Sequence, residues 1–291
     1  MSPIDTPSAA TLAAPPRSLS ARLAAVREGL SLAVVRLKRP VRPNATPALR
    51  IFPDWPSRVA ATLIGAALAL ASMAYVDPVV QEAQHGIHGG LADLFELVTH
   101  VGKSGWLLWP TGIMLVVIGL AMPPVRGFAD KVVLALAARL AFLMAAVGGS
   151  GLIIAIVKRL IGRARPRYFE QFGTLHFDPT AWSSSFASFP SGHSQTAFAI
   201  AVAFACLFPR WRRLLVALAA LIAVSRIVVD AHYFTDIVVG SAWGAWFTLM
   251  TRDWFARRGF VFAPGPGREP FPMPRRRVAA AVRQLARRIR S

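Results

Sequence analysis

Six long apolar segments, almost free of charged residues, constrain this chain more than any other feature of its sequence. They are Val59–Val76, Ser104–Val125, Val132–Val157, Gly192–Pro209, Trp211–Val229 and Ile237–Thr251. An α-helix of roughly 20 apolar residues crosses the hydrocarbon core of a bilayer. Because 55% of the chain is apolar, a soluble helical bundle would have too little polar surface to cover it. The sequence therefore predicts an all-α integral membrane protein with six transmembrane helices.

The segments on either side of this six-helix core, residues 58–251, are basic. Residues 1–57 are rich in Pro and Ala, and residues 252–291 end in an amphipathic stretch from Pro274 to Ser291. We expect both to be cytoplasmic tails, with an amphipathic C-terminal helix lying on anionic lipid headgroups. A nucleic-acid-binding arm would carry a similar charge. No nucleic acid is expected as a partner, because no folded nucleic-acid module or aromatic stacking platform accompanies the tails.

The distribution of charge predicts the topology, because cytoplasmic flanks collect Lys and Arg. The chain has 33 Lys and Arg against 14 Asp and Glu, and most of the excess lies on the side of the two tails. The first loop on the opposite side is acidic, with Asp77, Glu82, Asp93 and Glu96. We expect both termini to be cytoplasmic, and the Ala- and Arg-rich composition suggests a bacterial inner membrane. The outer-face loop between helices 3 and 4, Lys158–Pro190, is basic and breaks the rule.

Ionisable side chains at the ends of the predicted helices are few, and they converge on the outer face. Such groups are costly near a membrane and indicate function. They give three cations, two histidines and one carboxylate, an arrangement that indicates an anion site with an acid and a nucleophile. The candidate residues are Lys158, Arg165, Ser191, Gly192, His193, Arg226, His232 and Asp236.

The first two motifs each allow a structural and a functional reading. Lys158 and Arg165 are seven residues apart, so two helical turns would direct both at one phosphate before Pro166 ends the helix. The same pair also fits an ordinary basic helix end. Pro190–His193 predicts a helix start, with a Ser cap and a Gly that lets an anion approach the backbone N–H groups. The alternative is a plain cap followed by an interfacial histidine.

The third motif places His232 and Asp236 four residues apart. On a helix, this spacing lets the carboxylate hold one imidazole nitrogen and free the other, as in the base-orienting half of a catalytic triad. Arg226 can direct its planar guanidinium at the same anion. Metal binding is the alternative, and we discount it because only one histidine and one acid face each other.

Together the three motifs resemble a known family. They read K-x6-R-P over Lys158–Pro166, P-S-G-H over Pro190–His193 and S-R-x5-H-x3-D over Ser225–Asp236. This ordered triple is similar to the type 2 phosphatidic acid phosphatase superfamily, which also includes the vanadium haloperoxidases. The resemblance covers about Val59 to Thr251.

The resemblance implies a mechanism without a metal or other cofactor. His232 would attack phosphorus and form a phosphohistidine, Asp236 would orient it, and His193 would protonate the leaving group. The phosphoryl oxygens would be held by Lys158, Arg165, Ser191, Gly192 and Arg226. Substrate binding would then account for the positive charge of the outer loop.

The resemblance also implies the substrate, a membrane lipid phosphate: phosphatidic acid, phosphatidylglycerol phosphate, undecaprenyl pyrophosphate or a lipid A phosphate. We expect a lipid phosphatase with a periplasmic active site. The alternatives are a phosphotransferase that passes the group to a second lipid, a non-catalytic lipid-phosphate binder, and a haloperoxidase, against which six spans argue. The aromatic residues between Arg159 and Phe189 suggest either a lid over the lipid headgroup or a small packed cap.

Overall fold

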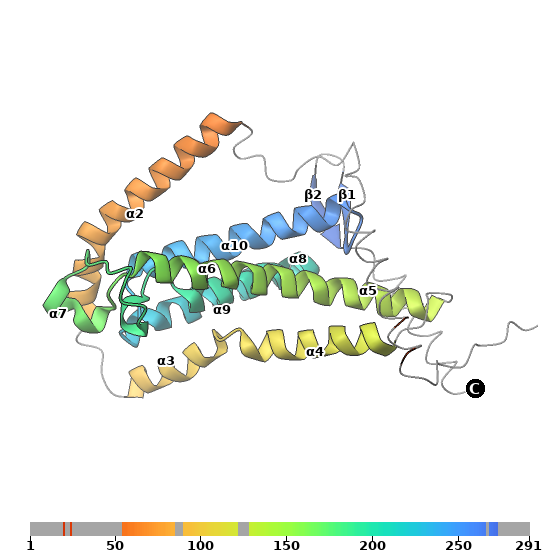
Figure 1. Ribbon diagram of the computed structural model, residues 1–291, viewed down its shortest axis with the longest axis horizontal. Helices are drawn as coiled ribbons and strands as arrows, with labels where there is room; N and C mark the ends of the chain where they lie inside the picture. The colour runs from red at the N-terminus through yellow and green to blue at the C-terminus, as the bar shows by residue number, and fades with distance from the viewer. Residues whose placement is uncertain are drawn as a thin grey trace, which may run out of the picture.

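The computed structural model describes residues 54–84, 90–121, 128–265 and 268–272, together with Ser20 and Ala24, and this part of the chain is mainly helical (Figure 1). The helices are α2 (Trp55–Gln84), α3 (Gly90–Val101), α4 (Gly105–Ala121), α5 (Phe128–Leu143), α6 (Gly149–Ile161), α7 (Phe169–Phe172), α8 (Gly192–Leu207), α9 (Arg212–Val228) and α10 (Phe234–Arg257). Strands β1 (Phe262–Gly265) and β2 (Arg268–Pro272) form a short antiparallel hairpin after α10. Apart from this hairpin, the regular structure of the described residues is all-α, as predicted.

Short helical turns complete the element order. A π-helical turn, η1 (Met144–Gly148), joins α5 to α6, so that one continuous helix runs over residues 128–161. Such a turn inserts an extra residue into a helix without breaking it. The 3-10 turns are η2 (Pro166–Tyr168), η3 (Ser184–Phe186) and η4 (Pro209–Trp211).

Each of the six predicted apolar segments coincides with a helix, but the first outer loop was predicted wrongly. The helix α2 continues past Val76 to Gln84, and α3 occupies much of the remainder of that loop. Along α3, Leu94, Phe95 and Val98 recur at helical spacing between acidic residues, and Val98 packs against α8 and α9. This amphipathic pattern favours a helix, although the segment carries charges and so did not stand out as an apolar span.

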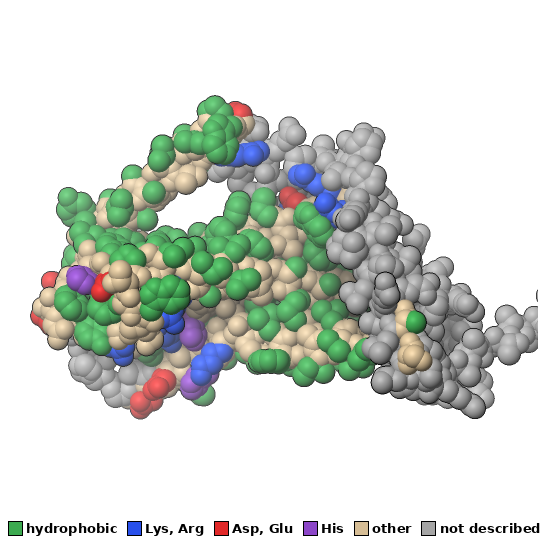
Figure 2. Space-filling model, in the orientation of Figure 1, with side chains coloured by type: hydrophobic (Ala, Val, Ile, Leu, Met, Phe, Trp, Pro, Cys, Tyr) green, Lys and Arg blue, Asp and Glu red, His purple; other side chains and the backbone are tan. Residues whose placement is uncertain are grey.

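Three helical stretches are long and apolar enough to cross a bilayer: Trp55–Gln84, Asp93–Leu120 and Val132–Ile161. Many of their apolar side chains face outward, with Leu63 65%, Trp109 75% and Leu152 64% exposed. Figure 2 shows hydrophobic side chains over the middle of the visible face and charged ones toward its ends. A surface of this kind needs lipid around it. The protein is therefore an integral membrane protein, and the count of six spans stays a prediction.

The helices α8 and α10 are in close backbone contact at the end of the bundle where both helices begin. A Cβ added at Gly240 would lie 2.4 Å from the carbonyl oxygen of Ser191, and one added at Gly244 would lie 2.3 Å from that of Gln195. Only glycine permits such an approach. The start of α8 is therefore held directly against the first turns of α10.

We predict that Gly240→Ala destabilises the protein, because the added methyl group would collide with a backbone atom that cannot rotate away. Overpacking of this kind costs about 1–3 kcal/mol or more, so the detergent-purified protein should lose several degrees of Tm. The control is Gly65→Ala on α2, where an added Cβ meets no atom within 4 Å. A Tm lowered equally in both variants would contradict the assigned contact.

Candidate active site

The candidate residues lie together at one end of the bundle, where α6 ends and α8 and α10 begin. Backbone hydrogen bonds join the segments: the Ser191 N–H donates to the Asp236 carbonyl over 3.0 Å, and the His232 N–H donates to the Arg226 carbonyl over 3.2 Å. His193 lies within electrostatic reach of Arg226 and His232. The structure therefore brings the three sequence motifs to one place, at the left of Figure 1.

The sequence analysis expected His232 and Asp236 to lie on one helix, but the structure separates them. His232 lies in the turn before α10, which begins at Phe234, and Asp236 lies in the first turn of that helix. The Asp236 Oδ2 accepts a hydrogen bond from the Tyr233 N–H at 3.1 Å and lies 3.5 Å from His232 Nδ1. The carboxylate thus caps α10 and approaches the imidazole, which leaves Nε2 as the nitrogen available for attack.

The imidazole of His232 is buried, with 2% of the side chain exposed. Burial lowers the pKa of His232 to about 4, because the charged ring loses its hydration, while Asp236 acts in the opposite direction. The positive charges of Arg165 and Arg226 lower this pKa further. His232 is therefore neutral at neutral pH, as a nitrogen nucleophile must be.

Lys158, Arg165 and Arg226 supply positive charge that no described carboxylate neutralises through an ion pair. The buried Nε atoms of Arg165 and Arg226 have no hydrogen-bond partner in the described part of the chain. One other nitrogen of Arg226 contacts the hydroxyl of Thr99 on α3. Buried donors without partners are costly, and a bound oxyanion would satisfy them.

Lys158 and Arg165 do not share a helix face. The helix α6 ends at Ile161, because Gly162 takes the left-handed conformation, with φ 64°, and Arg165 is extended. A Cβ added at Gly162 would lie 2.0 Å from the carbonyl oxygen of Asp178. A glycine C-cap therefore ends the helix earlier than Pro166, and the seven-residue spacing spans a turn instead of two helical turns.

The predicted helix start at Ser191 is confirmed. Ser191 is the N-cap of α8, and its hydroxyl accepts a hydrogen bond from the Ser194 N–H at 3.4 Å. Gly192 is the first helical residue and His193 the second. The turn between α3 and α4 lies against this start, since a Cβ added at Gly102 would lie 3.1 Å from His193 Cδ2. Backbone N–H groups at a helix start suit an anion.

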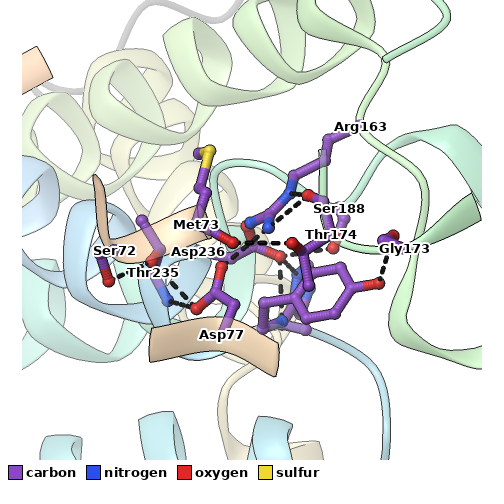
Figure 3. A network of polar contacts seen from close by, with 11 residues as sticks. Ser72, Met73, Asp77, Arg163, Gly173, Thr174, Ser188, Thr235 and Asp236 are labelled. Atoms are coloured by element: carbon purple, nitrogen blue, oxygen red, sulfur yellow. Dashed lines mark hydrogen bonds and ion pairs between the residues drawn. The ribbon is translucent and has the colours of Figure 1, made fainter. Parts of the chain in front are cut away.

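The sequence analysis missed the partners of Asp236. Arg163, which it grouped with the substrate-binding loop, is fully buried and donates from Nη1 to Asp236 Oδ1 at 2.5 Å and from Nη2 to Asp77 Oδ2 at 2.8 Å. Asp77, which it placed in an outer loop, is also fully buried. Figure 3 shows the guanidinium of Arg163 reaching between the two carboxylates. Ser188 donates its hydroxyl proton to Asp236 Oδ2 at 2.5 Å.

Tyr168, Phe172 and Phe186, in the segment between α6 and α8, pack on one another and on His176. The Phe172 and His176 rings stack with centroids 4.3 Å apart, and Tyr168 stacks on Phe186 at 6.3 Å. Trp182 is the most exposed aromatic residue among the described residues of this segment, at 71%, and Phe172 and Phe177 are also exposed. This packing supports the small cap, and the lid stays a prediction.

The sequence of this chain is similar to a family of membrane phosphatases. Residues 137–260 match the family model described as the PAP2 superfamily. A protein of Rhizobium johnstonii named lipid A 1-phosphatase is 42% identical over 177 residues, which are 60% of this chain and 71% of that protein. A protein of the same name from Rhizobium etli is 39% identical over 178 residues, 60% of this chain and 75% of its own length. The chain belongs to the PAP2 superfamily of membrane lipid phosphatases.

Two solved structures are also similar to this chain. The transmembrane PAP2-type phosphatidylglycerolphosphate phosphatase of Bacillus subtilis is 22% identical, with a TM-score of 0.46 over 66% of this chain and 92% of that one. LpxE of Aquifex aeolicus is 21% identical, with a TM-score of 0.42 over 60% of this chain and 92% of that one.

We predict that Arg163→Ala destabilises the protein strongly, because it leaves Asp77 and Asp236 buried without their shared counter-charge. Removing one partner of a buried ion pair costs about 3–5 kcal/mol. The measurement is the yield and Tm of folded protein in detergent. Arg167→Ala is the matched control, since Arg167 is exposed on the same segment. Equal Tm values for the two variants would refute the structural role of Arg163.

Proposed function

We propose that this chain removes the 1-phosphate of lipid A by metal-independent hydrolysis through a phosphohistidine intermediate. That it is a lipid phosphatase follows from its family and relatives. The observation that supports the mechanism is the placement of three cations, which form no ion pair with a described carboxylate, around the buried His232. The names of the two Rhizobium relatives support the choice of lipid.

The first step transfers the phosphoryl group to the protein. The Nε2 lone pair of His232 forms a bond to phosphorus as the bond from phosphorus to the lipid oxygen breaks. His193, which takes up a proton from solvent as the anionic phosphate binds beside it, donates that proton to the leaving oxygen. Asp236, beside Nδ1, stabilises the positive charge that the His232 ring acquires.

The second step releases phosphate. Water attacks phosphorus as the bond from phosphorus to Nε2 breaks, and His193, now neutral, accepts a proton from that water. The electron pair of the broken bond returns to His232, which becomes neutral again. Both steps pass through the same phosphoryl site, so one set of cations stabilises both transition states.

The charge on the transferred group is stabilised by three side chains, Lys158, Arg165 and Arg226. They act together with the hydroxyl of Ser191 and the backbone N–H of Gly192 at the start of α8. Phosphoryl transfer needs mainly positioning and positive charge. Fixed side-chain cations supply here what Mg²⁺ supplies in other phosphoryl-transfer sites.

The proposed topology follows from the charge distribution. Six helices cross a bacterial inner membrane, both termini are cytoplasmic and the site faces the periplasm. Residues 1–57 and 252–291 would bind anionic lipid headgroups as tails. The helix α10 continues past Thr251 to Arg257, while the amphipathic stretch Pro274–Ser291 lies outside the described residues.

The test is phosphate release by the full-length protein in detergent with excess chelator. Lipid A, phosphatidic acid, phosphatidylglycerol phosphate and undecaprenyl pyrophosphate are compared. We expect fastest release from lipid A and none from lipid A that lacks its 1-phosphate. His232→Asn should lower kcat by roughly 10³-fold or more, because it removes the nucleophile.

His100→Asn, a change of the same kind at an exposed histidine of α3, should retain the activity of the wild type. Loss of wild-type activity with chelator, or full activity of His232→Asn, would overturn the mechanism. Faster release from another lipid would overturn the choice of substrate alone. A phosphorylated acceptor lipid in place of free phosphate would identify a phosphotransferase.

A further inference from the structure

The helix α2 carries an unusual buried face. Its four buried side chains are Met73, Asp77, Gln81 and Gln84, which recur at helical spacing, while most of its apolar side chains are exposed. Three of these four buried residues are polar. Burying polar groups in an apolar helix is costly unless partners compensate, so the partners indicate what this face does.

Asp77 holds the first turn of α10. Its Oδ1 accepts hydrogen bonds from the Thr235 N–H at 2.8 Å and from the Thr235 hydroxyl at 2.9 Å. Its Oδ2 accepts from Arg163, which in turn donates to Asp236. Asp77 therefore acts on the Asp236 carboxylate in two ways. It holds the neighbouring Thr235, and it shares the guanidinium of Arg163 with Asp236 (Figure 3).

Gln81 and Gln84 hold the turn that precedes His232. Their side-chain amides donate to the same oxygen, Asp230 Oδ1, at 2.7 and 2.6 Å. Asp230 lies two residues before His232 and has a positive φ of 51°, a conformation that is uncommon for residues other than glycine, although Asp adopts it more readily than most. These two amides stabilise the turn in the conformation that presents the histidine.

The charges in this cluster have a consequence for the chemistry. Arg163 alone would neutralise the charge of Asp236, whereas Asp77, Arg163 and Asp236 together carry one net negative charge. All three side chains are fully buried, where charge is poorly screened. The His232 ring becomes positive as its nitrogen bonds to phosphorus, while Arg165 and Arg226 oppose that charge. A cluster with a net negative charge beside the ring stabilises the positive charge that the ring acquires.

From these contacts we infer that Asp77, Gln81 and Gln84 of α2 are positioning residues for the nucleophile His232 and its partner Asp236. The inference rests on the proposed function, in which His232 attacks phosphorus. It extends the active site to α2, which lies outside the residues 137–260 that match the family model. None of the three needs to touch the substrate.

The experiment compares full-length Asp77→Asn with the wild type, using lipid A as substrate. We expect kcat to fall about 10-fold or more and KM to change less than twofold, because the phosphate-binding cations are untouched. Orthovanadate, which can bond to the attacking nitrogen as a phosphoryl group does, should bind about 10-fold more weakly. Inorganic phosphate should bind with an affinity within twofold of that of the wild type.

Two further variants keep the test decisive. If Asp77→Asn does not fold, the double variant Gln81→Ala with Gln84→Ala should lower kcat and vanadate affinity in the same direction, by about threefold or more. Glu82→Gln removes a carboxylate from the exposed face of the same helix and should match the wild type in every measurement.

The outcomes separate the two proposals. Wild-type kcat and vanadate affinity in the α2 variants would overturn the positioning role while leaving the proposed function intact. A parallel rise in KM and in the phosphate dissociation constant, with kcat unchanged, would also overturn it, because that pattern indicates substrate binding. Full activity of His232→Asn would overturn the proposed function, and the positioning role with it.

Discussion

The ion cluster of Asp77, Arg163 and Asp236 is the interaction on which the rest of the site depends. Each charge is removed from water at a cost of several kcal/mol, which only close pairing offsets. The guanidinium of Arg163 meets both carboxylates and also donates to the Thr174 carbonyl oxygen. Because these groups come from α2, the segment after α6 and α10, the cluster fixes three parts of the chain relative to His232.

The positive charges of this site are divided between two tasks. Arg163 is paired and holds the structure, whereas Lys158, Arg165 and Arg226 have no ion-pair partner among the described carboxylates and are left for an anion. Arg163 and Arg165 are two residues apart, and the left-handed turn at Gly162 precedes both. The chain thus separates a structural cation, Arg163, from the proposed phosphate-binding one, Arg165, within a single motif.

Local patterns in the sequence were enough to predict the six main helices, the N-cap at Ser191 and the residues that gather at the site. The residue spacing used in the sequence analysis did not show that His232 lies outside α10 or that α6 ends at Ile161, since spacing alone does not reveal where a helix begins or ends. The sequence analysis also missed the pairing of Asp77 with Arg163, which are 86 residues apart. Long-range pairs of this kind depend on the packed fold, and sequence periodicity carries no information about them.

The central claim is that His232 forms a covalent bond to phosphorus during turnover. The most direct measurement is rapid quenching of the protein with labelled lipid A, under alkaline conditions that preserve phosphohistidine, followed by mapping of the label. The account predicts an acid-labile label on His232 that forms and decays at rates compatible with kcat. Turnover without any label on the protein, or a label on another residue, would contradict it.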